Sequence, residues 1–227
     1  MDQPALVVAI DGPSGSGKST VARRVASSFG LRYLDTGAMY RALTWWLLEQ
    51  QVDLADADQA GRLARELPLT MGTDPAEPTV HVGDRDVSTA IRTTRITDAV
   101  STVAANPGVR AEMRRRQRAV VDEGDVVVEG RDITTVVAPD APVRVLLTAH
   151  ADTRLARRAK ERHGADDEHA LARTRDEIVQ RDARDAAVSE FLEAAEGVTV
   201  VDSSHLTIDE TVAAVIALVE QWKEAPA

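Results

Sequence analysis

A glycine-rich loop near the start of the chain constrains the fold more than any other feature. Residues 5–10 form a short, continuous apolar run, which is typical of a strand buried on both faces of a parallel sheet. The loop GPSGSGKST follows at 12–20, and residues 19–28 then predict a helix that stops at Gly30. A strand, a glycine loop and a helix in this order predict the first unit of an α/β fold.

The loop matches the pattern G-x-x-x-x-G-K-[ST], which is a signature of polyphosphate binding. Glycine adopts positive φ without a clash of Cβ, so successive backbone N–H groups can turn inward, and the helix dipole adds to the attraction. Lys18 can reach the β- and γ-phosphates, and the Ser19 hydroxyl can ligate Mg²⁺. We therefore expect ATP or GTP with Mg²⁺ here, in preference to a turn that only connects strand and helix. The residues expected to contact the nucleotide are Gly12, Pro13, Ser14, Gly15, Ser16, Gly17, Lys18, Ser19 and Thr20.

The rest of the chain continues the alternation of strands and helices, with one insertion. Further core strands are predicted at 31–35, 126–128, 143–147 and 198–201, and helices at 38–51, 94–104, 109–121, 151–162, 171–185 and 208–222. Between about 61 and 88, short segments rich in β-forming residues alternate with Gly, Pro and Asp, which predicts a small antiparallel meander. We therefore expect one chain with a parallel-sheet core at about 1–61, 105–155 and 168–227, and an inserted lobe at about 62–104.

Composition excludes several classes of protein. The 227 residues carry a net charge of −10, which argues against general nucleic-acid binding. The absence of cysteine excludes disulfides and Cys-ligated metals, and it fits a reducing compartment. No apolar run approaches membrane-spanning length, and the first residues lack a secretory pattern. We expect a cytoplasmic protein without membrane or nucleic-acid partners.

Arginines are dense around the loops beyond the glycine loop, which suggests a second phosphorylated ligand opposite the first. The strand at 126–128 ends in Glu129, followed by Gly130, Arg131 and Asp132. Phosphoryl transfer needs two phosphates facing each other, because catalysis is mostly positioning and neutralisation of charge. These features favour a kinase that acts on a small phosphorylated molecule.

Seven segments, taken together, resemble the bacterial cytidylate kinase family in order and spacing. They are IDGPSGSGKST, LDTGAMYRAL, DVSTAIRT, STVAANPGVR, RRRQRAV, VVEGRDITTVVAPDAPVRVLLTA and RDARD. The resemblance implies a P-loop nucleoside monophosphate kinase: a three-layer α/β/α core with a parallel sheet, an inserted lobe of a small antiparallel sheet plus helix that binds the monophosphate, and a helical lid at about 156–167. It implies that ATP and CMP give ADP and CDP, with dCMP also accepted, Mg²⁺ accompanying ATP, and a monomer.

The resemblance also implies roles for individual residues. Arg41 and Arg131 would bind the CMP phosphate, with Thr36 against the nucleotide. Ser101, Arg110 and Asp132 would read the cytosine edge, and Arg181 and Asp185 would contact the ribose and phosphate side. Three arginines at i, i+3 and i+4 of one helix would close over the ATP phosphates, namely Arg154, Arg157 and Arg158. The catalytic residues would be Lys18, Arg131, Arg157 and Arg158.

Spacing alone leaves plainer interpretations open. Thr36 could cap a helix, the three arginines could form a solvated helix face, and Arg181 with Asp185 could be an i, i+4 ion pair. The chain also departs from the family pattern. Val188 stands where a further phosphate-binding arginine is expected, no Pro-Leu pair follows, and Thr134 replaces a usual glycine.

These departures leave alternative functions in view. One alternative is a P-loop kinase for another acceptor, such as UMP, AMP or shikimate. Another is a weakly active relative that binds nucleotides and has a regulatory role. A P-loop motor or switch is more remote, because the acidic strand end and partner-facing signatures of that class are not evident in the sequence.

Overall fold

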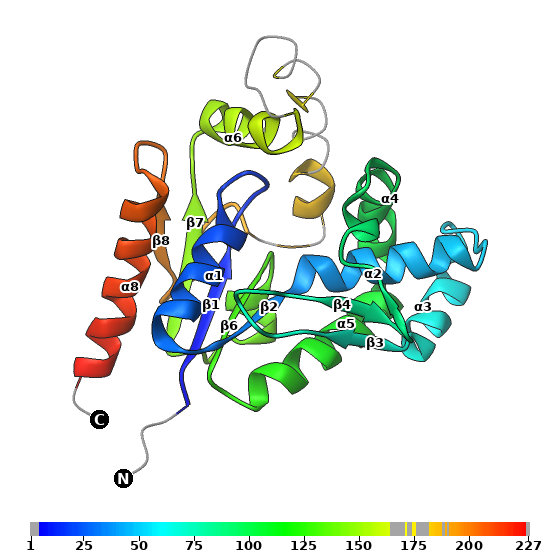
Figure 1. Cartoon of the computed structure of the whole chain (residues 1–227), viewed down its shortest axis with the longest axis horizontal. Helices are drawn as coiled ribbons and strands as arrows, with labels where there is room; N and C mark the ends of the chain where they lie inside the picture. The colour runs from blue at the N-terminus through cyan, green and yellow to red at the C-terminus, as the bar shows by residue number, and fades with distance from the viewer. Residues whose placement is uncertain are drawn as a thin grey trace.

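A parallel sheet of five strands forms the centre of the described part of the chain (Figure 1). The structure, a computed structural model, describes residues 5–163, 171, 174–175, 182–187, 189 and 191–225. The strand order is β2-β6-β1-β7-β8, and every neighbouring pair is parallel. The strands are β1 (Val7–Asp11), β2 (Arg32–Asp35), β6 (Val126–Gly130), β7 (Val143–Thr148) and β8 (Thr199–Asp202). All their carboxyl ends therefore meet at one edge, where α/β folds bind ligands.

Helices cover both faces of the sheet, so the core has the predicted three layers. Successive side chains of β1 alternate between two apolar clusters, because strand side chains point to opposite faces. Val8 and Ile10 pack with α1 (Lys18–Phe29) and α8 (Ile208–Glu224). Val7 and Ala9 join the cluster that includes α2 (Thr36–Glu49) and α5 (Pro107–Asp122). A strand buried on both sides explains the continuous apolar run in its sequence.

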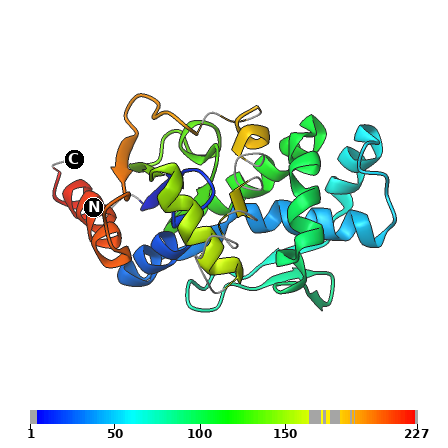
Figure 2. The same ribbon diagram turned by 90° about the horizontal axis from the view of Figure 1, so that it is seen from above.

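The predicted meander is a three-stranded antiparallel sheet in the order β3-β4-β5. It is followed by the 3₁₀ turn η1 and by helix α4, which packs on α2. The bounds of these elements are β3 (Leu69–Met71), β4 (Val80–Val82), β5 (Arg85–Asp86), η1 (Ala90–Arg92) and α4 (Thr94–Ala105). In the two views of Figures 1 and 2, this lobe and α8 lie toward opposite ends of the molecule.

Helix α3 (Ala57–Glu66) was not predicted from the sequence. Its buried face consists of Ala60, Gly61 and Ala64, which give only a weak apolar periodicity. Small residues are suitable there because α3 packs closely on α5: a Cβ on Gly61 would lie 3.4 Å from the Cα of Gly108. The expected boundary between core and lobe at 61 and 62 therefore falls inside a helix.

Two capping residues define the helices that border the site. Asp35 caps α2, since its Oδ1 accepts a hydrogen bond of 2.9 Å from Ala38 N. Asn106 caps α5 in the same way, with its Oδ1 2.8 Å from Gly108 N, and Pro107 occupies the first turn. The Asn-Pro-Gly break predicted from the sequence thus separates α4 from α5.

The predicted lid is described only in part. Helix α6 (Ala151–His163) covers the first part of the expected range 156–167, and residues 164–167 lie outside the described residues. Of the predicted helix at 171–185, the described positions 171, 174–175 and 182–185 are helical. Arg181 and Val188 lie outside the described residues. In the ranges that the structure does describe, no helix is both long and apolar enough to cross a membrane.

Candidate active site

A cavity of about 250 Å³ opens at the carboxyl edge of the sheet. Its wall combines the glycine loop, the start of α2, the end of β6, and side chains from α4, α5 and α6. Residues far apart in the sequence therefore meet in one space. The residues predicted from the sequence that line it are Ser14, Gly15, Gly17, Lys18, Ser19, Thr20, Thr36, Arg41, Ser101, Arg110, Arg131, Asp132, Arg158 and Asp185.

The backbone of the glycine loop adopts conformations that are unfavourable for residues with a Cβ atom. Gly12, Gly15 and Gly17 all have positive φ, at 154°, 76° and 89°. A Cβ on Gly12 would lie 2.1 Å from the Leu147 carbonyl oxygen, and one on Gly15 would lie 2.5 Å from that of Arg154. Gly12 and Gly15 are needed because the loop is pressed against β7 and α6, and Gly17 is needed only for its positive φ.

Helix α1 begins at Lys18, and its N-cap residue, Gly17, has no side chain that could accept from the first N–H groups of the helix. Such a helix start is suited to binding a phosphate. Lys18 is 8% exposed, lines the cavity, and donates a hydrogen bond of 3.0 Å to the Pro13 carbonyl oxygen. Gly12, Pro13 and Ser16 do not line the cavity and instead form the supporting side of the loop.

A buried carboxylate, Glu129, lies beside the lysine and serine of the loop. It is the next-to-last residue of β6, is 3% exposed, and accepts a hydrogen bond from the Tyr33 hydroxyl. Burial raises the pKa of the Glu129 carboxyl, the neighbouring Asp35 raises it further, and Lys18 opposes the shift. The nearby Ser19 hydroxyl opposes the shift as well. The sequence placed Glu129 at a strand end, but it gave no reason to include it in the site.

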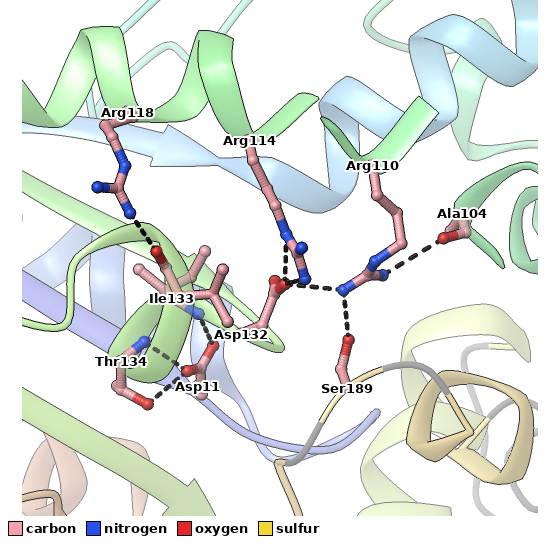
Figure 3. Close-up of polar contacts among 10 residues, drawn as sticks. Asp11, Ala104, Arg110, Arg114, Arg118, Asp132, Ile133, Thr134 and Ser189 are labelled. Atoms are coloured by element: carbon pink, nitrogen blue, oxygen red, sulfur yellow. Dashed lines mark hydrogen bonds and ion pairs between the residues drawn. The ribbon is translucent and has the colours of Figure 1, made fainter. Parts of the chain in front are cut away.

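Asp132 lines the same cavity and binds two arginines of α5 (Figure 3). Its Oδ2 accepts from an Arg110 guanidinium nitrogen at 2.8 Å, and from two nitrogens of Arg114 at 2.8 and 3.2 Å. Arg110 also donates to the Ser189 hydroxyl at 3.0 Å. Ser101 of α4 lines the same cavity and is 7% exposed.

Arg114 was missed in the sequence, although it follows Arg110 by one helical turn on the same face of α5. Arg92 of the lobe was missed as well. It lines the cavity, and one of its guanidinium nitrogens lies 3.4 Å from Asp35 Oδ2. Both residues lie in segments that carry the family resemblance, RRRQRAV and DVSTAIRT, but the sequence gives no indication of which side chains of these segments point inward.

Behind Asp132, the chain is held by a second buried carboxylate (Figure 3). Asp11, at the end of β1, accepts from Ile133 N at 3.0 Å, from Thr134 N at 2.7 Å and from the Thr134 hydroxyl at 2.7 Å. Burial raises the pKa of Asp11, and the hydrogen bonds from Thr134 oppose the shift. The π-helical turn η2 (Ile133–Val137) that follows Asp132 is thereby fixed to the strand leading into the glycine loop.

The two arginines expected at the acceptor phosphate both reach the cavity. Arg41 is 8% exposed and donates to the Ile91 carbonyl oxygen at 3.2 Å and to the Thr97 hydroxyl at 3.0 Å. Arg131 Nε lies 3.3 Å from Asp185 Oδ2. Thr36 is not the helix cap, and its hydroxyl donates to the Glu129 carbonyl oxygen at 2.7 Å.

The three arginines of α6 have different surroundings, and Arg158 alone of the three lines the cavity. Arg157 donates to the Ser203 hydroxyl at 2.9 Å and to the Ser203 carbonyl oxygen at 2.7 Å. Arg154 donates to the Ser14 carbonyl oxygen at 2.9 Å and forms a short ion pair with Asp182. Arg154 and Arg157 therefore support the glycine loop and the segment after β8 in this structure, in place of facing the cavity.

One cavity is thus lined both by a polyphosphate loop with a buried lysine and by a carboxylate that two arginines hold. With a parallel three-layer core, these features define a P-loop phosphotransferase for small phosphorylated molecules. The family model described as cytidylate kinase matches residues 8–221. The chain belongs to the cytidylate kinase family.

Individual relatives agree with this assignment. The chain is 43% identical over 225 residues to a cytidylate kinase of Streptomyces avermitilis, covering 98% of this chain and 96% of the relative. It is 46% identical over 221 residues to one of Cutibacterium acnes, with coverage of 96% and 98%. Among solved structures, a shikimate kinase from Bacteroides thetaiotaomicron superposes with a TM-score of 0.44 at 13% identity, covering 98% of this chain and 100% of that chain.

Proposed function

We propose that this chain transfers the γ-phosphoryl group of ATP to CMP and dCMP, giving CDP and dCDP. The observation that carries the proposal is the single cavity that joins the glycine loop to Asp132 and its arginines. A phosphate donor on Lys18 and a cytosine at Asp132 would share one space. The acceptor phosphate would then lie between them, near Arg41 and Arg131.

Positioning and charge neutralisation would supply most of the catalysis. The attacking oxygen belongs to the CMP phosphate, which is already anionic at pH 7, so no general base is required. Arg41 and Arg131 would hold this phosphate, since guanidinium groups bind phosphate through two parallel hydrogen bonds and keep their charge. Lys18 and Arg158 would stabilise the charge that moves between the two nucleotides.

Base specificity would come from hydrogen-bond complementarity. Cytosine presents an amino donor beside acceptor atoms at N3 and O2. Asp132 supplies an acceptor, while Ser101 and Arg110 supply donors in the same cavity. A base with the opposite pattern would leave these buried groups unpaired, and such mismatches are strongly rejected.

The residues around Ser19 fit a magnesium ion that arrives with ATP. Hydroxyl and carboxylate oxygens are the ligands that Mg²⁺ prefers; Glu129 lies near the Ser19 hydroxyl, and Asp35 is its neighbour on the adjacent strand. Among the described residues, no group of three or more His, Cys, Asp or Glu side chains is arranged to hold a metal. Ser19 would therefore bind the ion together with nucleotide phosphates and water. When bound, the ion would neutralise charge on the β- and γ-phosphates.

The test is a coupled assay of ADP release with Mg²⁺ and ATP. CMP, dCMP, UMP, AMP, GMP and shikimate would each be offered as acceptor. We expect turnover with CMP and dCMP alone. Turnover with another acceptor would be consistent with a kinase, but it would contradict the proposed role of Ser101, Arg110 and Asp132 in recognising the base. Binding of ATP and CMP without turnover would favour the regulatory alternative, and rapid hydrolysis of ATP without any acceptor would favour a motor or switch.

We also propose that the enzyme works as a monomer in the cytoplasm. Because the cavity is lined by residues of one chain, no second subunit is needed to complete it. Light scattering of the purified protein should give the mass of one chain at all concentrations. A stable dimer would contradict the proposed monomer without affecting the proposed reaction.

A further inference from the structure

The side chain of Phe191 lies against one of the two arginines expected at the acceptor phosphate. Phe191 is 1% exposed, and it is one of the largest fully buried side chains among the described residues. The Arg131 guanidinium carbon lies 5.1 Å from the centre of its ring. A guanidinium plane stacks favourably on an aromatic face, through the charge and through contact area.

Among the described residues, Arg131 has few other contacts that fix its direction. Its side chain is only 18% exposed, yet its Nε makes no hydrogen bond. The Asp185 carboxylate lies 3.3 Å from that Nε and attracts it without hydrogen-bond geometry. A further polar contact of the guanidinium within the described part of the chain is a long one, 3.4 Å from NH1 to the Gly130 carbonyl oxygen.

The ring and the carboxylate act on the guanidinium in different ways. Asp185 lines the cavity, and its carboxylate attracts the positive charge of the Arg131 guanidinium. Phe191 does not line the cavity and supplies a flat apolar support that forms no hydrogen bonds. The donors of Arg131 are therefore not consumed by the ring, and a phosphate in the cavity can accept from them.

We propose that Phe191 is a positioning residue for Arg131, holding its guanidinium in place for the acceptor phosphate. The inference depends on the proposed function, because the acceptor phosphate is the group that Arg131 would meet. Phe191 itself touches no substrate. Its effect should therefore depend on the phosphate of the acceptor and on the presence of Arg131.

The first test compares Phe191→Leu, which keeps apolar bulk, with Phe191→Tyr, which keeps the aromatic face. We expect Phe191→Leu to raise the KM for CMP roughly two- to thirtyfold, the range of a cation–π contact, and to leave the KM for ATP unchanged. Phe191→Tyr should remain within about twofold of the wild type. Binding of cytidine, which lacks the phosphate, should be the same in both variants by calorimetry.

A double-mutant cycle separates positioning from structural damage. In an Arg131→Gln background, Phe191→Leu should no longer change the KM for CMP. Phe29→Leu provides the matched control, because the ammonium group of Lys223 lies 4.5 Å from the centre of the Phe29 ring, away from the cavity. This control should leave both KM values unchanged.

Equal losses for CMP and ATP, or a loss that persists in the Arg131→Gln background, would overturn the inference. If Phe191→Leu fails to fold, Phe191→Met and Phe191→Tyr provide the same comparison. Wild-type protein without CMP turnover would refute the proposed function. Wild-type turnover with an unchanged Phe191→Leu variant would refute only the role of Phe191.

Discussion

At the scale of single residues, Asp132 does not hold its position alone. One of its oxygens accepts hydrogen bonds from both Arg110 and Arg114, and both arginines come from α5. The direction of the carboxylate is therefore set by the helix that faces it. Arg114 would then influence base recognition through Asp132 even though it does not line the cavity.

Replacing Arg114 with Met should weaken CMP recognition, because Asp132 would lose two of its three arginine hydrogen bonds. Charge-assisted hydrogen bonds contribute about 1.5–3 kcal/mol, so we expect the KM for CMP to rise on the order of tenfold or more. The KM for ATP should stay the same. Steady-state kinetics with each substrate varied in turn provides the measurement. Arg62→Met, at an exposed position of α3, is the control, and an unchanged KM for CMP in Arg114→Met would contradict this role.

Motifs predicted those parts of the site that lie on one local segment. Lys18 and Ser19 follow directly from the glycine loop, and both line the cavity. Arg114 and Phe191 could not be predicted in this way, because their partners lie 18 and 60 residues away in the chain and come into contact only through packing. Arg157 shows the opposite case. Its spacing on α6 predicted a place in the cavity beside Arg158, but its guanidinium donates to Ser203 instead.

At the scale of elements, Glu112 and Arg116 tie α5 to the end of α3. Glu112 is 8% exposed and accepts from Arg115 at 2.8 and 2.9 Å and from Arg116 at 2.6 Å. Arg116 in turn donates to the Leu67 carbonyl oxygen at 2.9 Å. The last carbonyls of a helix have no partner within it, so Arg116 supplies the missing donors at the end of α3.

This contact should make stability depend on pH through Glu112. Hydrogen bonds from Arg115, and then those from Arg116, lower the pKa of Glu112 to about 2. The pKa of Glu112 is therefore lower in the folded state than in the unfolded state, where it is near 4.3. The stabilisation from its carboxylate is present above that unfolded value and is lost as the pH falls toward 2. Glu112→Gln should therefore lower the Tm near pH 7, and its difference from the wild type should shrink below about pH 4.

Thermal unfolding at several pH values between 7 and 3 would check this prediction. Glu66→Gln, at an exposed position of α3, provides a control that should follow the wild type throughout. A Glu112→Gln deficit that stays constant across the range would show that the carboxylate charge is not the source of the stability.

At the scale of the whole molecule, β1 supports two parts of the cavity wall, the glycine loop and the turn that follows Asp132. Its last residue, Asp11, fixes the turn behind Asp132, and the next residue, Gly12, opens the glycine loop. The order of elements could be predicted because apolar runs and glycine breaks mark each strand and helix. This connection could not be predicted, because it joins residues 122 and 123 positions apart through one buried side chain.

Thr134 is the residue through which this connection can be weakened most selectively. Its hydroxyl donates to Asp11 Oδ2 at 2.7 Å, and Thr134 is 3% exposed. Thr134→Val keeps the shape and removes that donor, so we expect a loss of about 1–3 kcal/mol of unfolding free energy and a Tm lower by at least about 2 °C. Thr134→Ser, which keeps the hydroxyl, should unfold close to the wild type. If Thr134→Val and Thr134→Ser melt together, the hydroxyl contributes nothing, and the two backbone donors alone hold Asp11 to the turn.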